Sequence, residues 1–97
     1  MLNLEYRQLN DREVADCLRE LPNWSLAGDK ITRSFEFNSY AAGVMFASAV
    51  GQIADHLDHH PDIHIGYQTV DLSVNTHSVN GLSPYDFELA KRVDSLV

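Results

Sequence analysis

The sequence is poor in several features that mark particular classes of protein. One of its 97 residues is a cysteine, Cys17, so neither an intramolecular disulfide nor a cysteine-based zinc cluster can form. We expect Cys17 to be a small apolar side chain on a helix rather than a reactive thiol. Seven basic residues stand against fourteen acidic ones, which gives a net charge of −7. Because lysine and arginine form no cluster, direct binding to nucleic acid or to an anionic membrane surface is disfavoured.

Long hydrophobic runs are also missing. The most apolar stretch, residues 40–54, contains Ser48 and Gln52 and is shorter than the roughly 20 residues that cross a bilayer. Residues 1–10 lack the basic segment followed by an apolar one that a signal peptide requires. We therefore expect a cytoplasmic protein without membrane contact. A hydrophobic content of 44% is that of a folded globule, and residues 1–97 are expected to form a single domain.

Apolar periodicity predicts three elements in the first half of the chain. The capping-box pattern that starts at Asn10 predicts a helix that stops at Pro22. Residues 24–37 hold two apolar runs around a turn-forming tetrapeptide, which predicts a β-hairpin. Asn38 or Ser39 then caps a long helix. Four of its apolar residues recur at helical spacing and are expected to lie on a sheet: Phe46, Val50, Ile53 and Leu57.

The second half of the chain predicts two more strands and a last helix. The strands are residues 63–67 and 70–77, and in the latter the apolar residues share one face while polar residues as far as His77 share the other. Ser83 followed by Pro84 is a typical helix start. The order α-β-β-α-β-β-α packs most simply as an α+β fold, a four-stranded antiparallel sheet with three helices on one face.

The long helix carries a second stripe of small, uncharged residues where a solvated face would carry charges: Ala41, Val44, Ala47, Ser48 and Gly51. Either another helix of the same chain or a symmetry-related copy in an oligomer must cover it. We favour the oligomer, since a chain this short buries only about 60 to 65% of its unfolded surface and would gain from association.

Histidines are concentrated at the predicted end of the long helix, where four of five fall within nine consecutive residues. One histidine there, such as His56 or His64, is explained as a cation at the negative end of a helix dipole. The adjacent His59 and His60 are different, because with Asp55 one turn earlier they supply groups that titrate near neutrality and a carboxylate that can fix a tautomer. This pattern predicts proton-transfer chemistry.

Two other chemistries fit the sequence less well. His56 and His60 have the i, i+4 spacing of helical metal ligands. However, the segment has no His-Glu-x-x-His motif and no cysteine, so we expect no metal. Nucleophilic catalysis is disfavoured because Cys17 is remote from the histidines and no serine lies in a Gly-x-Ser-x-Gly motif.

The sequence resembles the pterin-4a-carbinolamine dehydratase family on residues that follow one another at the intervals of its signature: Asp55, His59-His60-Pro61, Tyr67, His77 and Asp86. The resemblance extends over about three quarters of the chain, including Trp24-Ser25, residues 31–37 and the Thr76-His77 pair. Two positions depart from animal members of the family, which more often have glutamate in place of Asp55 and have tryptophan in place of Ile63.

The resemblance implies the fold derived above and assembly as a homodimer or homotetramer in which helices or sheet edges meet. It implies a hydro-lyase that dehydrates 4a-hydroxytetrahydropterin to a quinonoid dihydropterin, which recycles the pterin of aromatic amino-acid hydroxylation. No metal or organic cofactor is implied. The departing hydroxyl must be protonated while the neighbouring ring nitrogen loses a proton, so two proton-handling groups must flank the ring.

The resemblance also implies roles for individual residues. His59 and His77 are candidate proton donors to the leaving hydroxyl, and His60 binds and orients the pterin. Asp55 supports the adjacent pair of His59 and His60. These three histidines are the candidate catalytic residues.

Two further residues of the signature have alternative explanations. Tyr67 either lines the pocket or is a strand residue of the core. Asp86 either only caps the last helix or also positions His77.

A second hypothesis is a non-catalytic binding or assembly module on the same fold, such as a partner that stabilises a protein dimer. Relatives that lack the histidines act in the assembly of other proteins. The intact set of histidines favours the enzyme.

Overall fold

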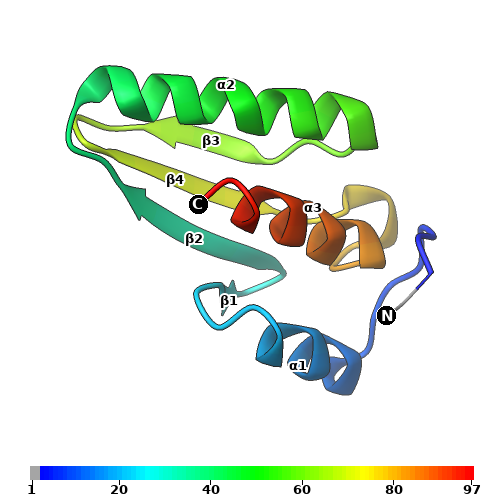
Figure 1. Cartoon of the computed structure of the whole chain (residues 1–97). Helices are drawn as coiled ribbons and strands as arrows, with labels where there is room; N and C mark the ends of the chain where they lie inside the picture. The colour runs from blue at the N-terminus through cyan, green and yellow to red at the C-terminus, as the bar shows by residue number, and fades with distance from the viewer. Residues whose placement is uncertain (1–2) are drawn as a thin grey trace.

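The computed structural model describes residues 3–97. Within them, three α-helices and four strands follow one another in the expected order α-β-β-α-β-β-α (Figure 1). The elements are α1 (Asp11–Arg19), β1 (Ser25–Ala27), β2 (Lys30–Glu36), α2 (Tyr40–Leu57), β3 (Asp62–Ile65), β4 (Thr69–Val74), the short 3-10 helix η1 (His77–Val79) and α3 (Pro84–Asp94). No helix in this part of the chain is long and apolar enough to cross a bilayer.

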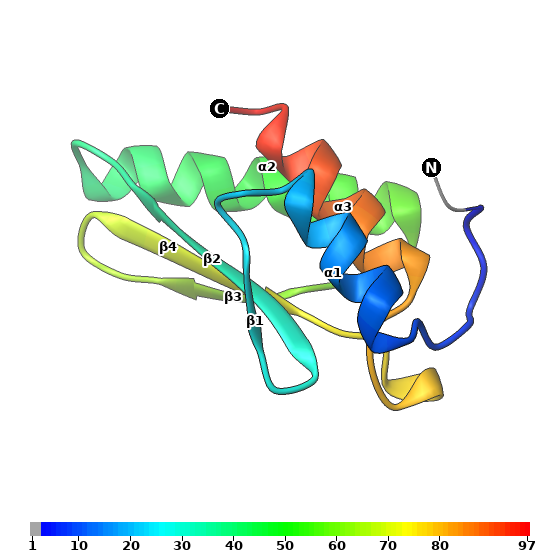
Figure 2. The ribbon, with the colours of Figure 1, turned by 90° about the horizontal axis from the view of Figure 1, so that it is seen from below.

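The four strands form one antiparallel sheet in the order β1-β2-β4-β3. The two long strands β2 and β4 lie at its centre, where Ile31 pairs with Val74 and Phe35 pairs with Val70. All three helices lie on the same side of the sheet (Figure 2). The α+β fold expected from the sequence is therefore confirmed.

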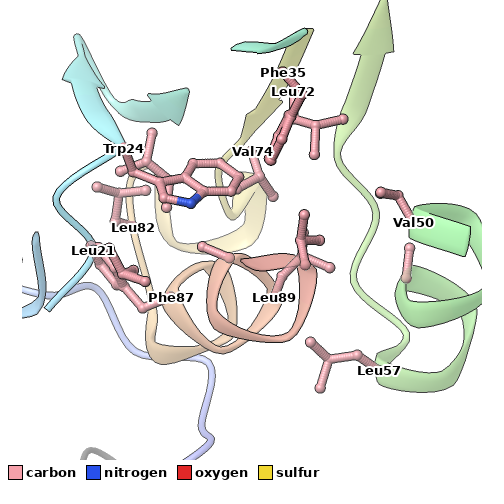
Figure 3. Packing of buried hydrophobic residues seen from close by; sticks show 14 of the residues in the cluster. Leu21, Trp24, Phe35, Val50, Leu57, Leu72, Val74, Leu82, Phe87 and Leu89 are labelled. Atoms are coloured by element: carbon pink, nitrogen blue, oxygen red, sulfur yellow. The ribbon is translucent and has the colours of Figure 1, made fainter. Parts of the chain in front are cut away.

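The core fills the space between the sheet and the helices. Val70, Leu72 and Val74 alternate along β4 and are each at most 3% exposed. From α2, the expected stripe supplies Phe46, Val50 and Leu57, all buried, with Ile53 partly buried at its edge. Figure 3 shows Val50, Leu57, Leu72 and Leu89 converging from α2, β4 and α3.

The helix ends follow the capping patterns of the sequence. In α1, Asn10 and the Glu13 side chain form both hydrogen bonds of a capping box. The α2 helix begins after Ser39, whose side chain accepts a hydrogen bond from the backbone of Ala42. Ser83 and Asp86 form a second capping box at the start of α3. Local side-chain chemistry thus determines where these helices begin.

The end of β4 differs from expectation. The strand stops at Val74 instead of continuing to His77, and Thr76 instead makes an isolated bridge to Gly81. Beyond Val74 neither neighbouring strand pairs with β4, because the pairing with β2 ends at Ile31 and the pairing with β3 ends at Asp62. Without strands on either side the backbone must find other partners, and it turns into η1.

The stripe of small residues on α2 is mostly uncovered within the described chain. Ala41, Val44 and Ser48 are exposed, whereas Ala47 is turned inward and buried. A Cβ atom built at Gly51 would meet no heavy atom within 4 Å. Packing against a helix of the same chain, one of the two expected alternatives, is therefore wrong for the exposed part of the stripe. The oligomeric alternative stays a prediction.

Candidate functional site

Two adjacent histidines, His59 and His60, follow the end of α2 and lie in different surroundings. Asp58 ends the helix in a left-handed conformation with φ of 54°, and the backbone N–H of His59 returns to the carbonyl of Ala54 at 3.0 Å. After this turn His59 is buried, with 7% of its surface exposed, whereas His60 is exposed. Of these two adjacent histidines, His59 is therefore largely shielded from solvent and His60 is in contact with it.

His59 lies against a fully buried carboxylate from α3. Its Nε2 is 2.6 Å from Oδ1 of Asp86. The other oxygen, Oδ2, accepts hydrogen bonds from the hydroxyl of Thr76 at 2.7 Å and the backbone N–H of Ser83 at 2.9 Å. The hydroxyls of Thr76 and Ser83 are themselves 2.8 Å apart. These four residues form a continuous hydrogen-bonded cluster.

The cluster leaves one ring nitrogen of His59 available. A carboxylate can only accept hydrogen bonds, which places the ring proton of neutral His59 on Nε2. No fully buried side-chain nitrogen or oxygen of the described residues lacks a hydrogen-bond partner. Because no described residue makes a hydrogen bond to Nδ1 of His59, this nitrogen retains some contact with the surroundings of the protein. Nδ1 is therefore the atom through which His59 can exchange a proton with a bound molecule.

Two tyrosines cover the ring of His59. The ring centre of Tyr85 lies 5.7 Å from that of His59, and Tyr6 lies 6.5 Å away. The two tyrosine rings stack on each other at 4.3 Å with an interplanar angle of 15°. Partial desolvation, together with nearby Tyr85 and Asp58, raises the pKa of Tyr6. Neither tyrosine was singled out from the sequence.

The segment before α1 is anchored so that Tyr6 reaches the histidine. The backbone N–H of Leu9 donates to the carbonyl of Leu82 at 2.8 Å. Arg7 makes two hydrogen bonds to the carboxylate of Glu13, at 3.0 and 2.9 Å. The contact between Leu9 and Leu82 joins residues far apart in the sequence, so no local pattern could have indicated it.

Asp55 is paired with His60 on the surface. Oδ1 of Asp55 is 2.8 Å from Nε2 of His60, and both side chains are exposed. The expectation that Asp55 supports the histidine pair therefore applies to His60 within this chain, while the partner of His59 is Asp86.

His77 begins η1 and is exposed. It directly follows Thr76, whose hydroxyl lies 3.4 Å from Nε2 of His59. The backbone therefore places His77 next to the buried cluster although it is not on a strand. The carboxylate of Asp86 contacts His59 in addition to capping α3, whereas it makes no direct hydrogen bond to His77 in the described structure. A role of Asp86 in positioning His77 stays a prediction.

Tyr67 is not near the histidines within this chain. It lies on the turn between β3 and β4 and is 78% exposed. The four residues of β3, which span about 13 Å, separate this turn from His59 and His60 (Figure 1). The alternative of a core strand residue is therefore wrong. A pocket role for Tyr67 stays a prediction and requires a site completed from elsewhere.

The remaining histidines and the cysteine lie apart from this cluster. His56 and His64 are exposed. Cys17 packs against the core, and burial, with smaller contributions from Glu20 and Asp16, raises the pKa of its thiol. A thiol with a raised pKa is a poor nucleophile. Among the described residues, no group of three or more His, Cys, Asp or Glu side chains could hold a metal ion.

The structure thus brings together the buried pair of His59 and Asp86 and the exposed His60 and His77, each of which directly follows a residue of the buried cluster. Side chains of this kind can donate and accept protons. The family model described as pterin 4 alpha carbinolamine dehydratase matches residues 7–96. The chain belongs to this family.

Individual relatives agree with the family assignment. A protein of Streptomyces avermitilis with a provisional pterin-4-alpha-carbinolamine dehydratase name is 46% identical over 89 residues, which are 91% of this chain and 88% of that protein. A protein of Natronomonas pharaonis with the same provisional name is 42% identical over 90 residues, covering 91% of this chain and 98% of the relative.

Two solved structures are similar to the chain. The transcriptional coactivator/pterin dehydratase of Brucella melitensis has a TM-score of 0.88 and 32% identity, covering 93% of this chain and 98% of its own. A pterin dehydratase-like protein identified as a RuBisCO assembly factor in the alpha-carboxysome has a TM-score of 0.62 and 24% identity, over 75% of this chain and 84% of its own. The latter likeness concerns the fold alone.

Proposed function

We propose that this protein dehydrates 4a-hydroxytetrahydropterin to the quinonoid dihydropterin by acid–base catalysis. The observation that carries the proposal is the buried pair of His59 and Asp86, at 2.6 Å, in a chain of the dehydratase family. A buried carboxylate that holds one ring nitrogen leaves the other free for proton transfer, which is what loss of a hydroxyl group as water requires.

The proposed reaction adds a proton to the departing hydroxyl and removes another proton from the neighbouring ring nitrogen. When His59 is protonated on both nitrogens, Nδ1 gives its proton to the departing hydroxyl while Asp86 stays bound to Nε2. The carbon–oxygen bond breaks, and the neighbouring ring nitrogen forms a double bond to the same carbon with its electron pair. That nitrogen then releases its proton to the solvent. His77 is the second proposed proton donor. His60, held by Asp55, binds and orients the ring.

The direct test is a coupled assay. Protein treated with a chelator is added to a phenylalanine hydroxylase reaction, and the decay of the 4a-carbinolamine absorbance is followed. We expect faster decay than in the absence of the protein. An unchanged decay rate would contradict the dehydratase, and activity that disappears with the chelator and returns with zinc would replace the acid–base mechanism with a metal-dependent one.

A second candidate function is a non-catalytic assembly module. The observation that favours it is the uncharged stripe on α2, where Ala41, Val44 and Ser48 are exposed. One structural neighbour of the same fold is described as a RuBisCO assembly factor. The stripe also fits a homodimer or homotetramer, which we propose as its use here because a small domain gains stability by association.

A further inference from the structure

Thr76 occupies the junction between β4 and η1 and is 4% exposed. Its hydroxyl is close to three groups of the buried cluster. It donates to Oδ2 of Asp86 at 2.7 Å, lies 2.8 Å from the hydroxyl of Ser83, and is 3.4 Å from Nε2 of His59. A single hydroxyl therefore connects the proposed proton donor, its carboxylate and the start of α3.

The direction of each hydrogen bond in this cluster follows from the number of protons. A hydroxyl has one proton to donate, and the carboxylate of Asp86 has none. Thr76 gives its proton to Asp86, so between the two hydroxyls Ser83 must be the donor. Ser83 in turn accepts from the backbone N–H of Tyr85 at 3.3 Å. The bonds therefore run in one direction, from Tyr85 through Ser83 and Thr76 to Asp86.

This direction determines which oxygen of Asp86 faces His59. Oδ2 already accepts two hydrogen bonds, from the Thr76 hydroxyl and the Ser83 backbone. Oδ1 is left to accept from the ring, and it does so at 2.6 Å. Thr76 thus holds the carboxylate in the orientation in which Oδ1 reaches Nε2 of His59. While that contact persists, the proton of neutral His59 stays on Nε2 and Nδ1 carries none.

The backbone of Thr76 acts on the other proposed proton donor. Its N–H donates to the carbonyl of Gly81 at 2.8 Å, and its carbonyl accepts from Val79 at 3.2 Å and from Gly81 at 3.4 Å. These bonds close the loop of residues 76–81 on which His77 lies. The side chain of Thr76 therefore restrains the position of His59, and the main chain of Thr76 restrains the position of His77.

We propose that Thr76 is a positioning residue for the dehydration reaction: its hydroxyl holds the Asp86 carboxylate against His59, which fixes the tautomer of that histidine, and its backbone fixes His77 beside it. The inference rests on the function proposed above. Thr76 itself touches neither the pterin nor a reacting atom in this scheme. It acts on the placement of both proton donors, and small displacements of such groups lower reaction rates strongly.

Two substitutions separate the hydroxyl from the bulk of the side chain. Thr76→Val keeps the branched shape and removes the hydroxyl, whereas Thr76→Ser keeps the hydroxyl and removes a methyl group. If the hydroxyl matters, the serine variant retains function and the valine variant does not. If only packing matters, the order is reversed or the two variants behave alike.

The experiment measures the tautomer of His59 and the kinetics in the full chain. Nitrogen-15 NMR of the two ring nitrogens, without substrate and at a pH where the ring is neutral, distinguishes a protonated Nε2 from a protonated Nδ1. We expect a protonated Nε2 in the wild type and in Thr76→Ser, and a mixture of tautomers in Thr76→Val. For dehydration we expect kcat to fall by about 10- to 100-fold in Thr76→Val with KM little changed, and to stay near the wild-type value in Thr76→Ser.

Several results would overturn the inference. They are a wild type with the proton on Nδ1, a valine variant with unaltered tautomer and kcat, and a serine variant as impaired as the valine variant. Should Thr76→Val not fold, Thr76→Ala removes the same hydroxyl, and the tautomer of His59 and the kcat of that variant then test the inference in the same way. If the wild type has no dehydratase activity, the proposed function fails, and the tautomer measurement still decides whether Thr76 positions His59.

Discussion

Asp86 and His59 are 27 residues apart in the sequence, yet a carboxylate oxygen of one lies 2.6 Å from a ring nitrogen of the other. The same carboxylate completes the capping box of α3. One side chain therefore performs two tasks, since it stabilises the start of a helix and holds the buried histidine of the proposed site. The two tasks can be separated by substitution.

Asp86→Asn tests the charge at this position. The amide retains an acceptor for the Ser83 backbone, but it can present its NH₂ group to His59 and so favour the wrong tautomer. We expect kcat for dehydration to fall by about 10²-fold or more, with a smaller effect on stability. Steady-state kinetics and thermal unfolding of the same preparations measure the two effects.

The chain offers a matched control for this substitution. Glu13 occupies the corresponding position in the capping box of α1, and its side chain bonds to Asn10 and Arg7. Glu13→Gln removes a capping carboxylate in the same local geometry without direct contact to His59, and the amide oxygen can still accept a hydrogen bond from Arg7, which anchors the segment of Tyr6. Equal losses of kcat in the two variants would show that the effect of Asp86 is general destabilisation.

The division of work among the histidines gives a second prediction. We expect His59→Ala and His77→Ala to lower kcat, each by about 10²- to 10⁴-fold, because both are proposed to donate protons. His60→Ala should raise KM more than it lowers kcat, because His60 is exposed and proposed to bind the ring. Enzyme kinetics on each variant, and on the double variant of His59 and His77, separate these effects.

Two exposed histidines outside the cluster serve as controls. His56→Ala and His64→Ala should leave kcat and KM near the wild-type values. Should His64→Ala prove as damaging as His77→Ala, the site would have to be redrawn around β3.

The exposed stripe of α2 gives a third prediction, on assembly. A Cβ at Gly51 meets no heavy atom within 4 Å in the described chain, so Gly51→Arg has room at its Cβ in the isolated subunit. It also removes a residue that weakens helices by about 1 kcal/mol relative to alanine. In an oligomer that buries the stripe, the same arginine would be buried without a partner. We expect Gly51→Arg and Ser48→Arg to lower the mass in solution to that of a monomer, as measured by light scattering.

Ala15→Arg, on an exposed position of α1, is the matched control and should leave the mass unchanged. A wild-type protein that is monomeric at micromolar concentration would contradict the interface, and the stripe would need another partner.

Asp94 provides a prediction about stability alone. Its Oδ1 accepts hydrogen bonds from Nε1 of Trp24 at 2.8 Å and from Arg33 at 2.7 Å, which ties α3 to the hairpin. Asp94→Ala leaves the indole N–H without this acceptor, and we expect a loss of about 1 to 3 kcal/mol in the free energy of unfolding. Since Trp24 is the single tryptophan of the sequence, its fluorescence during urea unfolding reports on the change directly. Asp94→Asn keeps an acceptor and should lose less.

The elements were predictable from the sequence because their determinants are local. The capping boxes that begin at Asn10 and Ser83 each lie within four residues, and the alternation of Val70, Leu72 and Val74 is a property of one strand. Local patterns also gave the position of His59 at the end of a helix. They could not give the end of β4, which depends on where the strands on either side stop.

The partners within the site were less predictable. For Asp86 the alternatives from the sequence were a cap of the last helix alone or an added role in positioning His77. Its contact with His59 was not expected, because that contact depends on how α3 packs against the end of α2. Tyr6 reaches the same histidine from a segment that shows no periodic pattern. Residue types and spacing thus indicated the candidate residues, whereas the pairing among them depends on the three-dimensional arrangement.

The amide of Ser83 and the ring of His59 are held by opposite oxygens of one carboxylate. The first turn of α3 therefore cannot fray without releasing the histidine, so local unfolding of that turn and opening of the site are one event. Deuterium uptake at the Ser83 amide then measures how often the site opens, in the resting protein and without any substrate.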